Sequence, residues 1–180
     1  MADRASTGDG STMVTGLFSD SESVERAYGA VANLGYDKGD VNVVMSDDTR
    51  KRYFSEDRQI DTELARKDAE GGELGGPKGG RISILIPILA AVGTSVAFAG
   101  LGVVLAGPVA VALVGAGAAG LAAGLVGALA DWGIPEERSR RYEAAIRDGG
   151  ILVGVKSRSA EDARLIAQQW IEIRGQHVHA

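Results

Sequence analysis

One uncharged segment constrains this chain more than any other feature. From Ile82 to Ala130 there are 49 residues without a charged side chain, although the 180-residue chain carries 43 Asp, Glu, Lys and Arg residues in total. Such a segment must be buried in a core, in a bilayer or between chains, because soluble monomers rarely expose large apolar patches. The chain therefore divides into two charged halves with an apolar insert between them.

The insert carries its strongest turn signal at its centre, in the pair Gly107-Pro108. This pair interrupts a helix and can form a hairpin turn. It leaves two arms, 82–106 and 109–130, that would each be about 33–37 Å long as helices. A bilayer core is about 30 Å thick. The insert therefore predicts an apolar helical hairpin long enough to enter or cross a membrane.

Small residues recur in both arms with spacings of three, four and three, which places each set on one stripe of a helix. The two sets mirror each other about the turn, so antiparallel arms would bring them face to face. Small side chains let helix backbones approach closely. We therefore predict a glycine zipper. Its candidate helix-packing residues are Ala90, Gly93, Ala97, Gly100, Gly117, Gly120, Gly124 and Gly127.

Three glycines of the second arm also match the spacing of a dinucleotide-binding turn. They are Gly115, Gly117 and Gly120. A dinucleotide site requires a following apolar strand that ends in an acidic residue. The corresponding region, "IPEERSRRY" from Ile134 to Tyr142, is polar and helical in pattern. The zipper interpretation is therefore favoured over nucleotide binding.

The two charged halves show the same order of elements. Each has an apolar strand, an amphipathic helix and a second strand. We expect strands at Met13–Phe18, Val41–Met45, Ile151–Val155 and His177–His179. Ser19 or Ser21 is expected to cap the first helix, and Ser157 or Ser159 the second, because serine side chains accept from free backbone N–H groups. Two β-α-β units predict an α+β fold of the ferredoxin-like sandwich type.

This pattern defines five segments. They are a flexible N-terminal tail at 1–12, the first half of the domain with a charged helical segment at 13–70, a glycine-rich linker at 71–81, the apolar hairpin at 82–130 and the second half of the domain at 131–180.

Basic residues flank both ends of the insert, and Trp132 follows its second end. A hairpin places both ends on one side of a membrane, and positive charge favours the cytoplasmic side. We expect an inner-membrane-associated protein with its charged domain in the cytoplasm, or alternatively a cytoplasmic protein. Candidate contacts to lipid headgroups are Lys78, Arg81, Trp132, Arg138, Arg140 and Arg141.

The residues for catalysis are sparse. The chain has no cysteine and two histidines, His177 and His179, which are expected on a terminal edge strand or, without a third ligand nearby, in a weak metal site. We expect no enzyme activity, no cofactor, no metal and no small-molecule substrate. A net charge of -5 argues against nucleic acid as a partner.

Several segments together resemble a bacterial general stress protein family that includes low-temperature-induced proteins. They are "VTGLFSDSESVERAYGAVANLGY", "VNVVMSDDTRKRYF", the Gly/Ala-rich insert, "WGIPEERSRRYEAAIRDGGILVGV" and the closing helix. The resemblance covers nearly the whole chain from Met13 onward. It implies a role in stress responses and supplies no catalytic residue.

These observations predict a non-enzymatic, stress-associated protein. It would self-assemble as a homo-oligomer and associate with membrane lipid through the glycine-zipper hairpin. One alternative is a soluble homo-oligomeric shell or ring with the hairpins as its core. A second is a ligand-binding regulatory domain.

Overall fold

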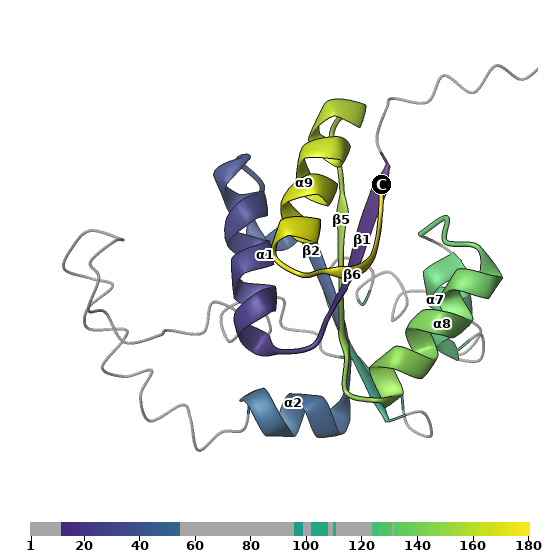
Figure 1. Cartoon of the computed structure of the whole chain (residues 1–180). Helices are drawn as coiled ribbons and strands as arrows, with labels where there is room; N and C mark the ends of the chain where they lie inside the picture. Colours follow the sequence, from purple (N-terminus) through teal and green to yellow (C-terminus); the bar gives the residue numbers. More distant parts are fainter. Residues whose placement is uncertain (1–11, 55–95, 99–101, 108–109, 111–123, 131) are drawn as a thin grey trace, which may run out of the picture.

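The domain is organised around an antiparallel sheet of six strands in the order β3-β4-β2-β5-β1-β6. The computed structural model describes residues 12–54, 96–98, 102–107, 110, 124–130 and 132–180 (Figure 1). The strands are β1 (Met13–Phe18), β2 (Val41–Ser46), β3 (Val96–Phe98), β4 (Val103–Ala106), β5 (Ile151–Lys156) and β6 (Gln176–His179). The helices are α1 (Ser21–Asn33), α2 (Asp47–Phe54), α7 (Gly124–Ala130), α8 (Glu136–Arg147) and α9 (Ala160–Glu172), with a short 3-10 helix at Lys38–Asp40.

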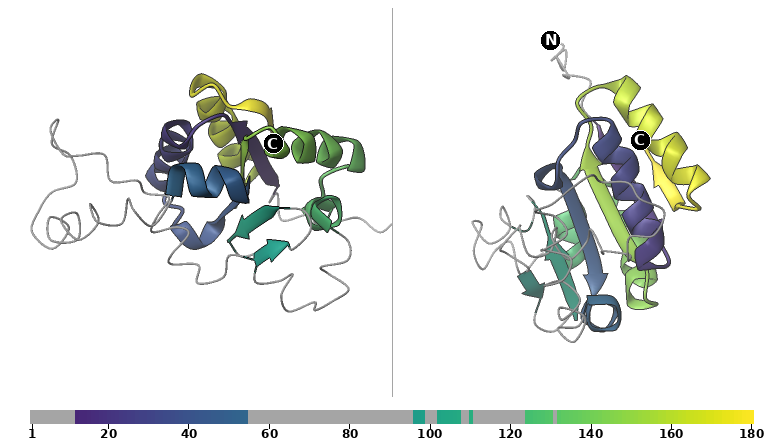
Figure 2. Two further views of the ribbon diagram at one scale, coloured as in Figure 1. Left: turned by 90° about the horizontal axis from the view of Figure 1, so that it is seen from below. Right: turned by 90° about the vertical axis from the view of Figure 1, so that its left-hand side faces the viewer.

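Helices cover both faces of this sheet. Helices α1 and α9 lie on one face, and α7 and α8 lie on the other (Figures 1 and 2). Strand β5 shows the alternation clearly, because Val153 belongs to the core under α1 and α9, whereas Leu152 belongs to the core under α7 and α8. Strands buried on both faces read as continuous apolar runs. This explains the unbroken apolar character of "ILVGV" in the sequence.

The four strands predicted in the charged halves are confirmed, as are the helices between them. The residue that caps α1 differs from the prediction, which named Ser19 or Ser21. Asp20 is the N-cap, and its carboxylate accepts the Ser23 backbone N–H at 2.7 Å and the Ser23 hydroxyl at 3.1 Å. Burial alone would raise the pKa of Asp20, but the hydrogen bonds from Ser23 outweigh it and the pKa lies below its ordinary value.

Helix α9 begins at one of its two predicted caps. The Ser159 hydroxyl accepts the Asp162 N–H at 3.0 Å. Ser157 has a different role, since its hydroxyl donates to the Thr12 carbonyl at 2.8 Å and holds the chain just before β1 against the end of β5. An oxygen two residues too early cannot reach the free N–H groups of the first turn.

The first arm of the insert was predicted to be a helix, and this prediction is wrong for the residues that the structure describes. Val96–Phe98 and Val103–Ala106 are strands β3 and β4. Without β4, one side of β2 would be a sheet edge with unpaired backbone groups, which is unfavourable in a buried position. Strand β4 pairs with β2 from Val43 opposite Ala106 to Ser46 opposite Val103. Its apolar, partly β-branched side chains suit a sheet better than a helix.

The structure bears on the predicted zipper only in part. Ala97 lies in strand β3 and so cannot take its place in a helical stripe, whereas Gly124 and Gly127 lie in helix α7, where a helix was expected. The remaining zipper positions lie outside the described residues. They are Ala90, Gly93, Gly100, Gly117 and Gly120.

The predicted hairpin turn begins at the end of β4. Gly107 follows that strand with a φ of 121°, and a Cβ added there would lie 2.6 Å from the Asn42 side-chain oxygen. The left-handed φ and this close approach both require glycine. Pro108 lies outside the described residues. Across the described parts of the chain, no helix combines the length and the apolar character needed to cross a membrane.

A glycine-to-alanine change in β5 tests the packing of the second face. A Cβ at Gly154 would overlap the ring of Trp132, so we expect Gly154→Ala to lower the free energy of unfolding by about 1–3 kcal/mol. Gly29→Ala in α1 is the control, because a Cβ there meets nothing within 4 Å and alanine favours a helix by up to about 1 kcal/mol. Urea denaturation measures both. Equal stability of the Gly154 variant and the original chain would contradict the described packing.

Candidate functional site

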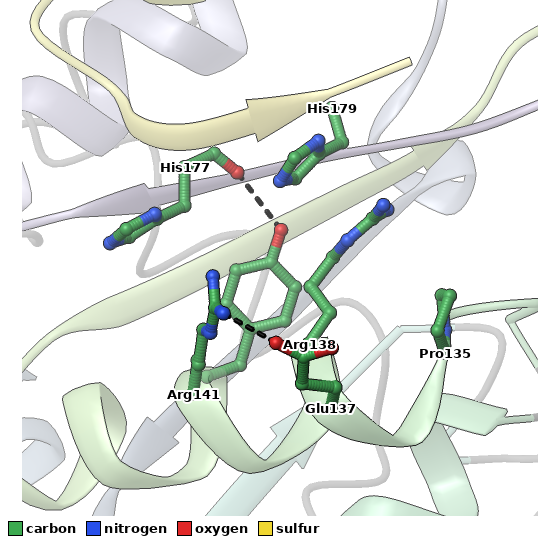
Figure 3. A pocket seen from close by; sticks show the side chains of 7 residues that line it. Pro135, Glu137, Arg138, Arg141, His177 and His179 are labelled. Atoms are coloured by element: carbon green, nitrogen blue, oxygen red, sulfur yellow. Dashed lines mark hydrogen bonds and ion pairs between the residues drawn. The ribbon is translucent and has the colours of Figure 1, made fainter.

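A cleft of about 250 Å³ lies between the first half of helix α8 and the last strand, β6 (Figure 3). It is lined by Pro135, Glu137, Arg138, Arg141, Tyr142, His177 and His179. Four of these seven side chains are basic, although the chain as a whole has a net charge of -5. The cleft therefore differs in charge from the protein that carries it.

Tyr142 fixes the distance between helix α8 and the sheet. Its side chain is fully buried, and its hydroxyl donates to the His177 carbonyl at 2.9 Å and lies 3.0 Å from the Thr15 hydroxyl. Because Thr15 is in β1 and His177 is in β6, this one hydroxyl contacts two neighbouring strands. Burial raises the pKa of Tyr142, so the phenol remains protonated and able to donate at neutral pH.

Strand β6 presents both histidines to the cleft. Its pairing with β1 is irregular between Thr15 and Leu17, and His177 has a φ of 48°. Irregularities of this kind redirect side chains at the edge of a sheet. In Figure 3 the His179 ring lies beside the end of Arg138, and Arg141 extends towards His177.

The arginines of helix α8 differ in their partners. Arg140 pairs with Glu136, Arg141 with Glu137 and Arg147 with Glu143, each one helical turn apart. Arg138 has no carboxylate partner within the part of the chain that the structure describes. Its positive charge in the cleft is therefore not balanced by a neighbouring acid there.

The electrostatics of the cleft act on His179. Burial lowers the pKa of His179, and the positive charges of Arg138, His177 and Arg141 lower it further. The imidazole is therefore mainly neutral at neutral pH. Burial and the charged neighbours both disfavour its cationic form.

The structure brings together only two of the predicted headgroup residues, Arg138 and Arg141. Arg140 lies outside the cleft, with its side chain 71% exposed beside Glu136. Trp132 was predicted at a lipid interface, whereas in the structure it belongs to the core under α7 and α8. Its side chain is 7% exposed and packs on Gly154, because the bare backbone of that glycine leaves room for the ring on the sheet. Lys78 and Arg81 lie outside the described residues.

The edge strand predicted for the two histidines is confirmed by β6. From the sequence, the histidines and the arginines were interpreted as separate features. Helix α8 and strand β6 are far apart in the chain, and Tyr142 and His177, which join them, are 35 positions apart. The two stretches that the fold brings together are "RSRR" and the terminal "HVH". In the described ranges no group of three or more His, Cys, Asp or Glu side chains is arranged to hold a metal ion.

Comparison with known proteins gives no match for this chain among protein-family models, curated proteins or solved structures.

The electrostatic coupling in the cleft can be tested with one pair of variants. We expect Arg138→Gln to raise the pKa of His179 towards its ordinary value of 6.5, because it removes the positive charge that lowers this pKa most. Arg140→Gln is the control, since Arg140 is on the same helix outside the cleft. Titration of the histidine ring protons by NMR gives both values. An unchanged His179 titration in the Arg138 variant would contradict the arrangement.

Proposed function

We propose that this chain is a non-enzymatic binding protein whose cleft between α8 and β6 holds an anionic group. The observation that carries this proposal is the position of Arg138. Its guanidinium lines the cleft without a carboxylate partner among the described residues, close to two histidines and a second arginine. Guanidinium groups bind carboxylates and phosphates through two parallel hydrogen bonds.

The polar groups of the cleft favour binding over catalysis. A nucleophilic mechanism requires a hydroxyl or thiol within hydrogen-bond reach of a base. The hydroxyls of Tyr142 and Thr15 are bonded to each other, and Tyr142 also donates to a backbone carbonyl. No hydrogen bond joins a histidine ring to a hydroxyl within the described residues. The hydroxyls therefore hold the fold together and leave the basic side chains to meet a ligand.

The arrangement of strands supports a ferredoxin-like core for this binding domain. Strands β6, β1, β5 and β2 are adjacent in that order, and the crossing helices α1 and α9 lie together on one face. In this proposal β3, β4, α7 and α8 are additions to the core. Because ferredoxin-like domains have many unrelated functions, the proposed activity rests on the cleft.

Anion titration tests the proposed function. We expect sulfate added to the full chain to shift the NMR signals of His177, His179 and the first turn of α8. Arg138→Gln should weaken this binding about tenfold or more, because a hydrogen bond to a charged group contributes on the order of 1.5–3 kcal/mol. Arg140→Gln should bind as the original chain does. Absence of shifts in the original chain, or equal binding by the Arg138 variant, would refute the proposal.

A second proposal concerns the uncharged insert and retains the expectation from the sequence. We propose that the insert drives self-assembly and lipid association in a stress-associated protein, with a soluble shell or ring as the alternative arrangement. Helix α7 supports this, since its seven residues are all apolar or glycine, yet Val126 and Gly127 are only half-buried and Ala130 is exposed. An apolar face of this kind is suited to contact with another chain or with lipid.

The assembly proposal is tested by particle size. We expect the original chain to form a discrete oligomer in light scattering after gel filtration. Gly127→Leu should reduce its size, because a large side chain prevents close packing at a small-residue position. Flotation with phosphatidylglycerol vesicles then distinguishes lipid association from a soluble shell. A monomeric original chain that does not float would contradict both arrangements.

A further inference from the structure

We infer that the cleft takes the terminal phosphate of a phosphomonoester, and that His179 gains a proton and donates a hydrogen bond when this dianion binds. This inference rests on the proposed anion-binding function. It adds the chemical class of the ligand and the coupling of binding to protonation. Three properties of the cleft lead to it: its size, the directions of its donors and its charge.

The size of the cleft limits what it can hold. Its volume of about 250 Å³ is below the range of about 300–1,000 Å³ that is usual for drug-sized ligands. The cleft is open to solvent, because the Arg141 side chain on its rim is 65% exposed. A compact charged group therefore fits inside, while the rest of a larger molecule extends into solvent.

The donors of the cleft come from two opposite sides, which suits an anion with several acceptor oxygens. Arg138 and Arg141 extend from α8 on one side, and the histidines come from β6 on the other (Figure 3). Pro135, the N-cap of α8, also lines the cleft, so the positive end of this helix dipole borders it. A planar carboxylate has two acceptor oxygens, whereas a terminal phosphate has three. The wider spread of donors favours the phosphate.

The net charge of the cleft explains why His179 would take up a proton when a dianion binds. Two arginines and Glu137 leave a single net positive charge in the cleft when the imidazoles are not counted. A phosphomonoester brings two negative charges near neutral pH. Protonation of His179 supplies the second positive charge and a ring N–H donor. Binding of the dianion therefore favours the cationic imidazole that the empty cleft disfavours.

The groups that shift the pKa of His179 all lower it. Burial has the largest effect, and Arg138 and Arg141 from α8 and His177 from β6 lower the pKa further. Glu137 also lines the cleft but is not among the groups that shift this pKa. Strand β1, which pairs with β6, has no titratable side chain between Met13 and Phe18. No charged group of α9 contributes to this pKa. An anion in the cleft would be the strongest opposing influence and would raise the pKa.

The protonation step is tested with sulfate, which remains a dianion throughout the range used. We expect the dissociation constant to fall as the pH is lowered from about 7.5 to about 5.5, by up to about tenfold per pH unit where one proton is taken up per anion. His179→Gln should flatten this dependence. Arg140→Gln is the matched control and should keep it, because Arg140 does not line the cleft.

The ligand class is tested at constant pH with phenyl phosphate, a monoester, and dimethyl phosphate, a diester. We expect roughly tenfold tighter binding of the monoester, and loss of this preference in Arg138→Gln. Flotation with vesicles that contain phosphatidic acid or phosphatidylglycerol identifies the source. Binding to phosphatidic acid alone supports a lipid monoester headgroup, and binding to phenyl phosphate without flotation supports a soluble phosphomonoester.

The outcomes separate this inference from the proposed function. Equal affinity for the two phosphates, or sulfate affinity that does not change with pH, overturns the phosphomonoester inference while the cleft remains an anion site. If none of the anions shifts the signals of Arg138 and His179, both are overturned.

Discussion

Burial of the central strands on both faces is the constraint on which the rest of the structure depends. Strand β5 carries Val153 on one side and Leu152 on the other, and each belongs to a separate apolar core. A sheet of this kind needs a layer of helices on each face. Helices α1 and α9 provide the first layer. The second comes from the end of the insert and the residues after it, so the insert and the charged halves fold as one unit over the described residues.

The two helix layers each carry a large buried aromatic side chain that hydrogen-bonds outside its own helix. Trp170 packs on Phe18 beneath α1 and α9, at a ring-centroid distance of 5.6 Å, and its N–H donates to the Ala27 carbonyl. On the opposite face, Tyr142 reaches past the core to the edge of the sheet and bonds to Thr15 and His177. A buried hydroxyl needs such partners because an unpaired one is unfavourable. The cleft thus lies where the second layer meets the edge strand.

Much of this fold follows from local patterns, but the insert does not. The strands at Met13–Phe18 and Ile151–Lys156 are apolar runs bounded by turn signals, and α1 and α9 show helical spacing. The run "VVLA" at Val103–Ala106 is too short for periodicity to distinguish helix from strand, and its structure depends on the free edge of β2. The cleft depends on contacts between residues far apart in the sequence. The basic residues of "RSRR" were predicted as lipid-headgroup contacts from the sequence, whereas the position of Arg138 and Arg141 beside the terminal histidines could be seen only in the fold.

The same helix shows why one arginine lacks a carboxylate partner among the described residues while its neighbours have one. Glutamates at positions 136, 137 and 143 each pair with the arginine four residues later. Residue 134, which precedes Arg138 by the same spacing, is Ile134, and its side chain is buried beneath α8. A carboxylate there would have to lose its hydration inside an apolar core. The need to cover the second face of the sheet therefore places an apolar residue where an acidic partner would stand, and Arg138 is left directed into the cleft.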